Sequence, residues 1–216
     1  MNTPDEQAKA LANAALAEGD PTAWFERLYA AAGDGEAKVP WDRGDANPLL
    51  VDWITARGHG TGRAVVVGCG FGRDAEFLAG LGYDTAAFDI SETAVRDARA
   101  RHPKSTVDYQ TGDLLNLAPE LVGAFDFVLE SHTVQSLPPS LHAAATAGVR
   151  ALVAPGGTLL VLAAVADGSP GAPPWPLTRE EIDAFARDGL TAVRAEQPPG
   201  VADPSAVRWR AEFHRS

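Results

Sequence analysis

Three glycines at alternate positions, Gly68, Gly70 and Gly72, follow a short apolar run at 64–67. Glycine at such a turn can adopt positive φ and lets the backbone approach a ligand closely. A helix that begins directly afterwards adds free N–H groups at its first turn. A glycine turn between a strand and a helix is typical of sites for nucleotide-like ligands, and we interpret this segment as such a site.

Two acidic residues follow the next two expected strands. Asp89 closes the strand expected at 83–90, roughly 20 residues after the first glycine. A carboxylate there can accept hydrogen bonds from both hydroxyls of a ribose. Asp113 follows the strand expected at 106–110 and can reach an adenine amino group, while the amide of Leu114 can meet a ring nitrogen. In the alternative interpretation, Asp89 helps to start the next helix and Asp113 belongs to an ordinary turn.

The spacing of the glycines separates two classes of ligand. The dinucleotide pattern G-x-G-x-x-G requires a glycine at position 73, where this chain has Arg73. The pattern present, G-x-G-x-G, is carried by methyltransferases of the Rossmann-like class. An NAD-dependent oxidoreductase and a non-catalytic binder of an adenosyl ligand remain alternatives at this point.

The strand expected at 124–130 ends with two side chains that can exchange protons. Glu130 and His132 would lie at the carboxyl edge of a parallel sheet, where ligands bind in such folds. His132 is the candidate acid or base, with a hydrogen-bonded structural histidine as the alternative. Glu130 can orient His132 or hold an amino group of the ligand, and a simple buried acid is the alternative.

Aromatic residues offer a wall for this site. Trp24, Trp41 and Trp175 can enclose an apolar pocket and shield a sulfonium by cation–π contact, although each can equally serve core packing. Tyr29 lies on the same expected helix face as Trp24 and is expected to line the same pocket. Cys69, between two of the glycines, is interpreted as a small packing residue.

The elements that must position these residues alternate in type. Helices are expected around 8–15, after Asp20-Pro21 as cap and first helical residue, and from 49 to about 58. Strands at 63–68, 83–90, 106–110, 124–130 and 158–164 then alternate with helices at 74–79, 91–101 and 138–151. A loop at 167–176, a helix at 178–186 with a Thr178–Glu181 capping box, and strands at 190–195 and 206–214 complete the chain. This order predicts a parallel α/β sheet with helices on both faces.

Composition narrows the function classes. The 216 residues carry 18 Lys+Arg against 29 Asp+Glu, a net charge of −11, and no dense basic cluster, which argues against a nucleic-acid partner. One cysteine excludes an intrachain disulfide and thiolate-rich metal sites, and the histidines lack ligand spacing, so no metal is expected. Without a signal peptide or an apolar run of membrane-spanning length, we expect a cytoplasmic protein with no membrane contact.

The ordered motifs resemble those of class I S-adenosylmethionine-dependent methyltransferases: the 68–75 glycine segment, Phe88-Asp89-Ile90-Ser91, Gly112-Asp113 and Phe125-Asp126-Phe127-Val128. More narrowly, the chain resembles the thiopurine methyltransferase-like family, which includes thiol, thiocyanate and halide methyltransferases. That resemblance lies in the Trp24 to Tyr29 segment, Pro40-Trp41-Asp42, Arg73-Asp74 and Pro174-Trp175-Pro176-Leu177-Thr178, and it extends from about Trp24 to Leu190.

The resemblance implies a Rossmann-like, doubly wound, seven-stranded sheet with the last strand antiparallel, in a single domain. Residues 1–58 would form a helical lid and 59–216 the core. The cofactor would be S-adenosyl-L-methionine, with S-adenosyl-L-homocysteine as product. Its expected contacts are Trp41, Gly68, Cys69, Gly70, Gly72, Asp89, Ile90, Asp113, Leu114 and Glu130, and the substrate pocket would comprise Trp24, Tyr29, Trp41, His132 and Trp175.

The expected reaction is methyl transfer to a soft nucleophile of a small molecule: a thiol, thiopurine, thiocyanate or halide. An O- or N-methyltransferase of a small secondary metabolite is the alternative within the class. A soft anion needs only positioning, whereas a phenol or amine benefits from a base such as His132. A monomer or homodimer is expected.

Overall fold

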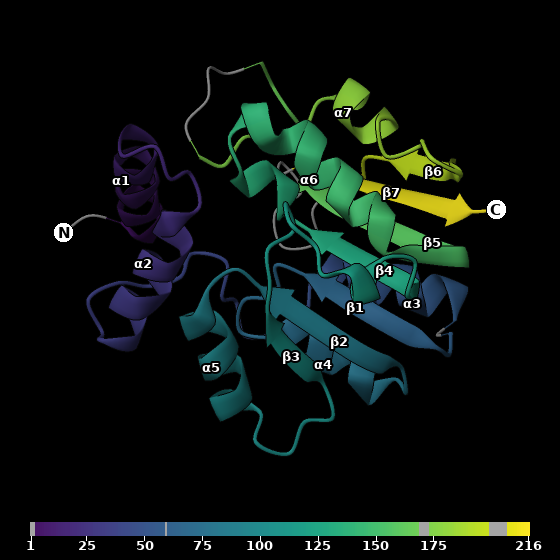
Figure 1. Cartoon of the computed structure of the whole chain (residues 1–216), viewed down its shortest axis with the longest axis horizontal. Coiled ribbons are helices and arrows are strands. Elements are labelled where there is room, and N and C mark those ends of the chain that lie inside the picture. Colours follow the sequence, from purple (N-terminus) through teal and green to yellow (C-terminus); the bar gives the residue numbers. More distant parts are fainter. Residues whose placement is uncertain (1–2, 59, 169–172, 199–206) are drawn as a thin grey trace.

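The computed structural model describes residues 3–58, 60–168, 173–198 and 207–216. Within them, seven strands form one sheet in the order β3-β2-β1-β4-β5-β7-β6 (Figure 1). β1 to β5 run parallel to one another, and β7 is antiparallel to both β5 and β6. The predicted doubly wound sheet with an antiparallel last strand is therefore confirmed.

The first strands are short and apolar because both faces of the sheet are covered. Val67, the last residue of β1, pairs with Phe88 of β2 and with Glu130 of β4. This register brings the carboxyl ends of three strands to one edge. The strands are β1 (Arg63–Val67), β2 (Asp84–Asp89), β3 (Asp108–Thr111), β4 (Phe125–Ser131), β5 (Val153–Ala164), β6 (Leu190–Glu196) and β7 (Arg208–Arg215).

Helices bury their apolar stripes on both faces of the sheet. One core cluster joins α6 and α7 to a face that includes Val65 and Val128, and a second joins α3, α4 and α5 to the face that includes Val66. Figure 1 shows α6 in front of the sheet and α4 behind it. The α-helices are α1 (Pro4–Ala17), α2 (Ala23–Gly33), α3 (Pro48–Arg57), α4 (Arg73–Gly80), α5 (Glu92–Arg101), α6 (Pro139–Leu152) and α7 (Arg179–Asp183).

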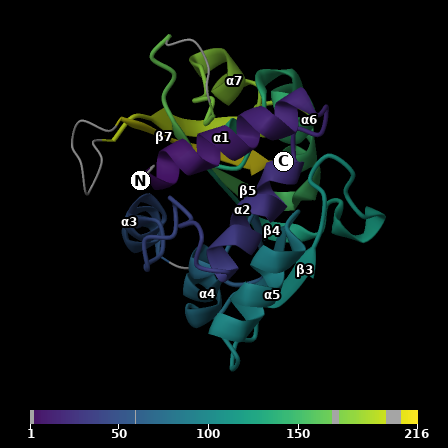
Figure 2. The same cartoon turned by 90° about the vertical axis from the view of Figure 1, so that its left-hand side faces the viewer.

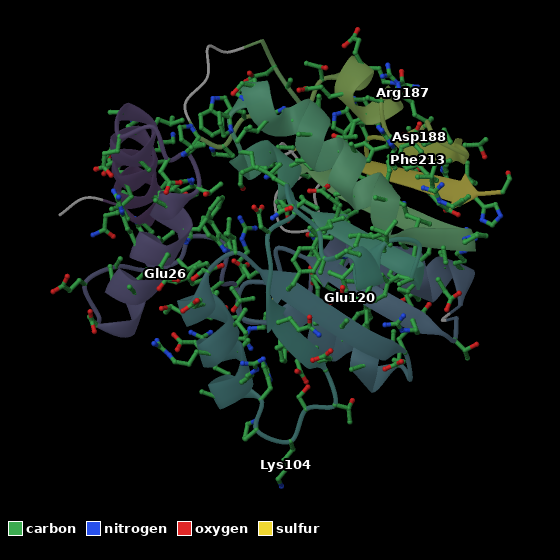
Figure 3. The ribbon with its side chains drawn as sticks, in the orientation of Figure 1. Glu26, Lys104, Glu120, Arg187, Asp188 and Phe213 are labelled. Atoms are coloured by element: carbon green, nitrogen blue, oxygen red, sulfur yellow. The ribbon has the colours of Figure 1, made fainter. Side chains whose placement is uncertain are left out.

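α1 and α2 form a third cluster at the edge where the parallel strands end (Figures 1 and 2). Glu26 of α2, labelled in Figure 3, fastens this pair to the start of α5. Its carboxylate accepts hydrogen bonds from the hydroxyls of Ser91 and Thr93, at 2.6 and 2.5 Å, and from the amide of Thr93 at 3.1 Å. Ser91 in turn accepts from the amide of Ala94 and caps α5, as predicted.

Several boundaries differ from those predicted. The second helix begins at Ala23 rather than at Pro21, because the Asp20 carboxylate accepts from the amides of Thr22 and Ala23 in a turn. The fifth strand begins at Val153, five residues early, since the chain pairs with β4 before the expected Pro-Gly turn. The helix after Thr178 has the predicted capping box but ends at Asp183. The predicted loop at 167–176 and the strand expected from 206 lie partly outside the described residues.

Candidate active site

A cavity of about 750 Å³ opens at the carboxyl edge of the sheet. Its wall comes from α1 and α2, from the 40–49 segment, from the glycine turn and from the ends of β2 and β4. Of the predicted site residues it contains Trp24, Tyr29, Trp41, Gly68, Cys69, Gly70, Asp89, Ile90, Asp113, Leu114 and His132. Three predicted residues, Gly72, Glu130 and Trp175, are not part of the wall.

The glycine turn requires residues without side chains. Gly68, Gly70 and Gly72 have φ values of 61°, 51° and 85°, in the left-handed region that disfavours other residues. A Cβ at Gly70 would lie 2.7 Å from the Tyr29 hydroxyl, and one at Gly72 would lie 2.1 Å from the Tyr109 hydroxyl. Gly72 therefore packs against Tyr109 and does not line the cavity. Gly68 and Gly70 line it, and there no side chain covers the backbone.

Asp89 ends β2 beside this turn and is 6% exposed. One carboxylate oxygen accepts from the amide of Gly70 at 2.9 Å, and the other accepts from the amide of Ser91 at 3.0 Å. Burial raises the pKa of Asp89, and the accepted backbone hydrogen bonds oppose that rise. Each oxygen retains a further lone pair, and Asp89 lines the cavity, so the group can accept hydroxyl donors from a ligand.

The next strand ends supply an apolar and a polar contact. Ile90 and Leu114 line the cavity together with Asp113. The Asp113 carboxylate accepts from the amide of Leu115 at 2.8 Å, which fixes the turn. Two apolar side chains and a carboxylate therefore lie together in this part of the wall.

Glu130 lies behind the wall. It is fully buried, and one of its oxygens accepts from the amides of Thr133 and Val134 at 2.7 and 2.9 Å. The other oxygen has no hydrogen-bond partner, and burial raises the pKa of Glu130 to about 7. Glu130 thus holds the turn after β4, and nothing places it on a ligand or on the His132 ring.

His132 follows β4 with a φ of 63° and lines the cavity. Its Nδ1 lies 3.2 Å from the Oε1 atom of Gln135, a buried side chain that also lines the cavity. Burial lowers the pKa of His132 to about 4, so the imidazole is neutral at pH 7. Sequence reasoning singled out His132 but missed Gln135, although a polar residue three positions later was a usable signal.

An aromatic cluster covers the glycine turn. The indole N–H of Trp41 donates to the Tyr29 hydroxyl at 2.9 Å, and the Tyr29 ring meets Phe71 edge-on at 5.0 Å. Trp41 is 43% exposed and lies edge-on to Trp24 at 6.0 Å. Trp24, Tyr29 and Trp41 therefore meet as predicted, whereas Trp175 lies elsewhere and its amide donates to the carbonyl of Gln135 at 2.7 Å.

Charged residues of the Trp41-Asp42 and Arg73-Asp74 motifs, to which the sequence assigned no role in the site, hold this wall in place. Asp42 accepts from Arg101 at 2.8 Å and from Arg73 at 3.4 Å, which ties the Trp41 loop to α4 and α5. Asp74 accepts from the amide of Asn47 at 2.7 Å, and burial raises the pKa of Asp74. These contacts join segments far apart in the chain, so no local spacing signals them.

The residues present fit S-adenosylmethionine on the geometry alone. A bare glycine backbone, a buried carboxylate with free lone pairs and the apolar side chains of Ile90 and Leu114 line one cavity. Burial and the charge of Asp89 raise the pKa of the Cys69 thiol well above its usual value, so it remains protonated beside the turn. That state agrees with a packing residue rather than a nucleophile.

Among the described residues, no group of three or more His, Cys, Asp or Glu could hold a metal ion. No helix in the described part of the chain is long and apolar enough to span a membrane.

The chain is similar in sequence to methyltransferases over much of its length. It is 28% identical over 204 residues to thiocyanate methyltransferase 1 of Arabidopsis thaliana, covering 91% of this chain and 84% of that protein. It is 34% identical over 141 residues to a ubiquinone biosynthesis O-methyltransferase of Paraburkholderia xenovorans, covering 64% of this chain and 53% of that protein.

Solved structures share the fold. A protein described in work on the conversion of a disulfide bond into a thioacetal group during echinomycin biosynthesis has a TM-score of 0.72 at 23% identity, covering 89% of this chain and 93% of that one. The 1,6-didemethyltoxoflavin-N1-methyltransferase of Burkholderia thailandensis, solved with S-adenosylhomocysteine, has a TM-score of 0.68 at 18% identity, covering 100% and 92%.

The profile of the family described as Thiopurine S-methyltransferase (TPMT) matches residues 34–206, more than half of the chain. That range includes the glycine turn, both acids and the turn that carries His132. The chain therefore belongs to the thiopurine S-methyltransferase family of S-adenosylmethionine-dependent methyltransferases.

Proposed function

We propose that this chain transfers the methyl group of S-adenosylmethionine to a soft nucleophile of a small molecule, namely a thiol, thiopurine, thiocyanate or halide. The observation that carries the proposal is the meeting of the glycine turn and Asp89 with the Trp24–Tyr29–Trp41 cluster around one cavity. The family profile and the thiocyanate methyltransferase relatives support the choice of nucleophile.

Each wall has a separate role in the proposal. The glycine turn would hold the methionine end of the cofactor, Asp89 the ribose hydroxyls, and Ile90, Asp113 and Leu114 the adenine. When bound, the cofactor supplies an electrophilic methyl group on a sulfonium. The residues of the chain position the two reactants and exclude water, which are the main contributions that a transfer to a soft nucleophile needs.

The aromatic cluster would close the site over the reacting atoms. Tyr29 is 2% exposed and holds the indole of Trp41 beside Gly70, so the aromatic cluster borders the place where the methionine end of the cofactor would lie. A wall of this kind excludes water and prevents hydrolysis of the methyl donor. We propose that residues 1–58 act as this lid over the core at 59–216, within one domain.

The alternative within the class is O- or N-methylation of a secondary metabolite. It is favoured by the neutral imidazole of His132 in the cavity wall and by the relatives named ubiquinone biosynthesis O-methyltransferase. The oxidoreductase alternative is dropped, because the family model and the relatives that match the chain are methyltransferases. A cytoplasmic monomer or homodimer that acts on a small molecule, without a metal, nucleic acid or membrane, completes the proposal.

Release of S-adenosylhomocysteine tests the proposal directly. The acceptors are a soft set (iodide, thiocyanate, hydrosulfide and an aryl thiol) and a hard set (a catechol, a phenol and an amine). We expect turnover with the soft set and a loss of turnover in Asp89→Asn. Turnover with the hard set alone would replace the proposal by the alternative, and silence with both sets while S-adenosylhomocysteine binds would overturn it.

A further inference from the structure

The amide of Gln135 has only one orientation that satisfies its neighbours. Its Oε1 atom accepts a hydrogen bond from the backbone N–H of Ala164 at 2.5 Å. A backbone N–H can only donate, so the side-chain atom that faces it must be the oxygen and not the NH₂ group. Gln135 is 5% exposed, and it lies against β5 through this contact.

The same oxygen lies 3.2 Å from Nδ1 of His132. An amide oxygen cannot donate, so Nδ1 must carry the hydrogen in this contact. The neutral ring then has its lone pair on Nε2. Burial keeps the ring neutral by lowering the pKa of His132 to about 4, and the positive charges of Arg43 and Arg208, which also line the cavity, act in the same direction.

The backbone around His132 fixes where the ring points. Its N–H donates to the carbonyl of Leu162 at 2.8 Å, and its carbonyl accepts from the Ser136 hydroxyl at 2.8 Å. Nε2 has no hydrogen-bond partner among the described residues. It does not belong to the fully buried side-chain atoms of these residues that lack a partner, so part of its surface remains accessible. Since His132 lines the cavity, Nε2 is the ring nitrogen that remains free to accept from a ligand.

We propose that Gln135 is a positioning residue that fixes the Nδ1–H tautomer of His132, so that Nε2 receives the hydrogen of the methyl acceptor. The inference rests on the proposed function and narrows it. The preferred acceptor is then a protic nucleophile, with S–H before O–H, rather than a bare halide or thiocyanate ion. A lone pair at Nε2 repels an anion, whereas it stabilises a neutral thiol with the hydrogen pointing toward it.

The step balances in atoms and charge. The S–H bond of the acceptor breaks and its proton goes to Nε2, while a sulfur lone pair forms the new bond to the methyl carbon. The electron pair of the broken bond to that carbon remains on the cofactor. One positive charge leaves the sulfonium and one appears on His132, whose low pKa then returns the proton to water.

Nuclear magnetic resonance of the free protein tests the tautomer without any turnover. Long-range ¹H–¹⁵N spectra of histidine-labelled protein separate the two tautomers, and His132→Asn identifies the signals that belong to His132. We expect Nδ1 to be protonated and Nε2 bare at pH 7. Gln135→Leu should populate the other tautomer, whereas Gln110→Leu, the same change at an exposed position of β3, should not. A proton on Nε2 in the parent protein would overturn the inference.

Kinetics test the role in catalysis. With an alkyl thiol, which is mostly protonated at pH 7, His132→Ala should lower kcat about 100-fold or more. Gln135→Leu should lower kcat about tenfold. Gln135→Glu keeps an acceptor for both N–H groups and adds a negative charge, so it should retain the tautomer and move the acidic limb of the kcat profile to higher pH. An unmoved limb would contradict the inference, because a carboxylate at this distance from Nδ1 must raise the pKa of a catalytic His132.

Failures of the two proposals can be told apart. If no acceptor of either set is methylated, the proposed function fails, while the spectra still report the tautomer. If iodide and thiocyanate are methylated as fast as the thiol, and His132→Ala affects all three equally, methyl transfer is upheld and the protic preference is wrong.

Discussion

The carboxylate of Asp89 accepts a hydrogen bond from the amide of Gly70 at 2.9 Å. The contact joins the end of β2 to the turn after β1, so the acid and the glycine loop form one rigid unit. A ligand that uses both therefore meets a surface that is already organised, which reduces the conformational entropy lost on binding.

Asp89→Asn tests this unit. The substitution replaces one charged acceptor oxygen by an NH₂ group, which cannot accept from the amide of Gly70 or Ser91 or from a ribose hydroxyl. We expect affinity for S-adenosylhomocysteine to fall by about 1–3 kcal/mol, measured by isothermal titration. Asp84→Asn, at the exposed opposite end of β2, is the matched control and should bind like the parent. Unchanged affinity in Asp89→Asn would remove Asp89 from the site.

Gly72→Ala tests the rear packing of the turn. Its φ of 85° disfavours alanine, and the new Cβ would meet the Tyr109 hydroxyl, which donates to Glu76 at 2.6 Å. We expect a loss of about 2 kcal/mol or more in the free energy of unfolding, measured with urea. Gly80→Ala, at the end of α4 with open space around it, should be neutral or stabilising. Equal stability of the two variants would refute the packing argument.

Glu130 predicts a pH dependence of stability. Its pKa is raised from 4.5 to about 7, so the folded protein binds a proton more tightly than the unfolded chain. The protonated Glu130 therefore contributes about 3 kcal/mol to the free energy of unfolding. This stabilisation is fully present below pH 4.5 and is lost as pH rises through 7. The parent loses this stability between pH 4.5 and 8, whereas Glu130→Gln does not. The difference in free energy of unfolding, variant minus parent, should therefore rise by that amount over this range.

The control for Glu130 uses a second glutamate. Glu120→Gln, at the exposed position labelled in Figure 3, should follow the parent at every pH. The opposite pH dependence that His132 contributes is common to all three proteins, so it cancels in the differences. A constant gap between Glu130→Gln and the parent would show that Glu130 does not titrate in this window.

Glu26→Gln tests the attachment of α2 to α5. Burial opposes the charge of Glu26, yet the hydrogen bonds from Ser91 and Thr93 outweigh it and lower the pKa of this carboxyl. Its contribution is present above pH 4.5 and is lost as pH falls through the lowered pKa. We expect Glu26→Gln to cost about 1 kcal/mol at pH 7 and nothing in strong acid. Equal stability of the two proteins at pH 7, measured by urea unfolding, would contradict this role.

The helices and the parallel strands could be predicted from the sequence because their signals are local, whereas the seven-stranded sheet with an antiparallel last strand followed from the family resemblance. Buried parallel strands are short apolar runs, and Ser91 and Thr178 mark helix starts by their own side chains. The site residues that lie on strand ends, such as Asp89 and Asp113, follow from the same pattern. Their position in the cavity wall is what a parallel sheet imposes on residues at its carboxyl edge.

The remainder depends on contacts between distant segments. The link between Gln135 and His132 depends on the Ala164 amide, which fixes the Gln135 oxygen from another strand. Trp175 carries a family-like motif, yet its backbone bonds to Gln135 and its ring is not in the wall. Glu130 lies at the end of the expected strand, but its side chain is buried and does not line the cavity. The spacing of three residues suggests Gln135 as a neighbour of His132, but neither residue type nor spacing shows that the Ala164 amide orients its oxygen or that Trp175 stays outside the wall.

The attachment of α2 to α5 also sets an order of assembly. α1 and α2 precede, in the chain, the glycine turn and α5, against which they pack, and the anchor points Ser91 and Thr93 follow Glu26 by 65 and 67 residues. Contacts of such separation carry a high loop-closure cost and form slowly. α2 is therefore fastened only once residues 91–93 are in place, and until then the side chains of Trp24 and Leu28 lack part of the packing that buries them in the folded protein.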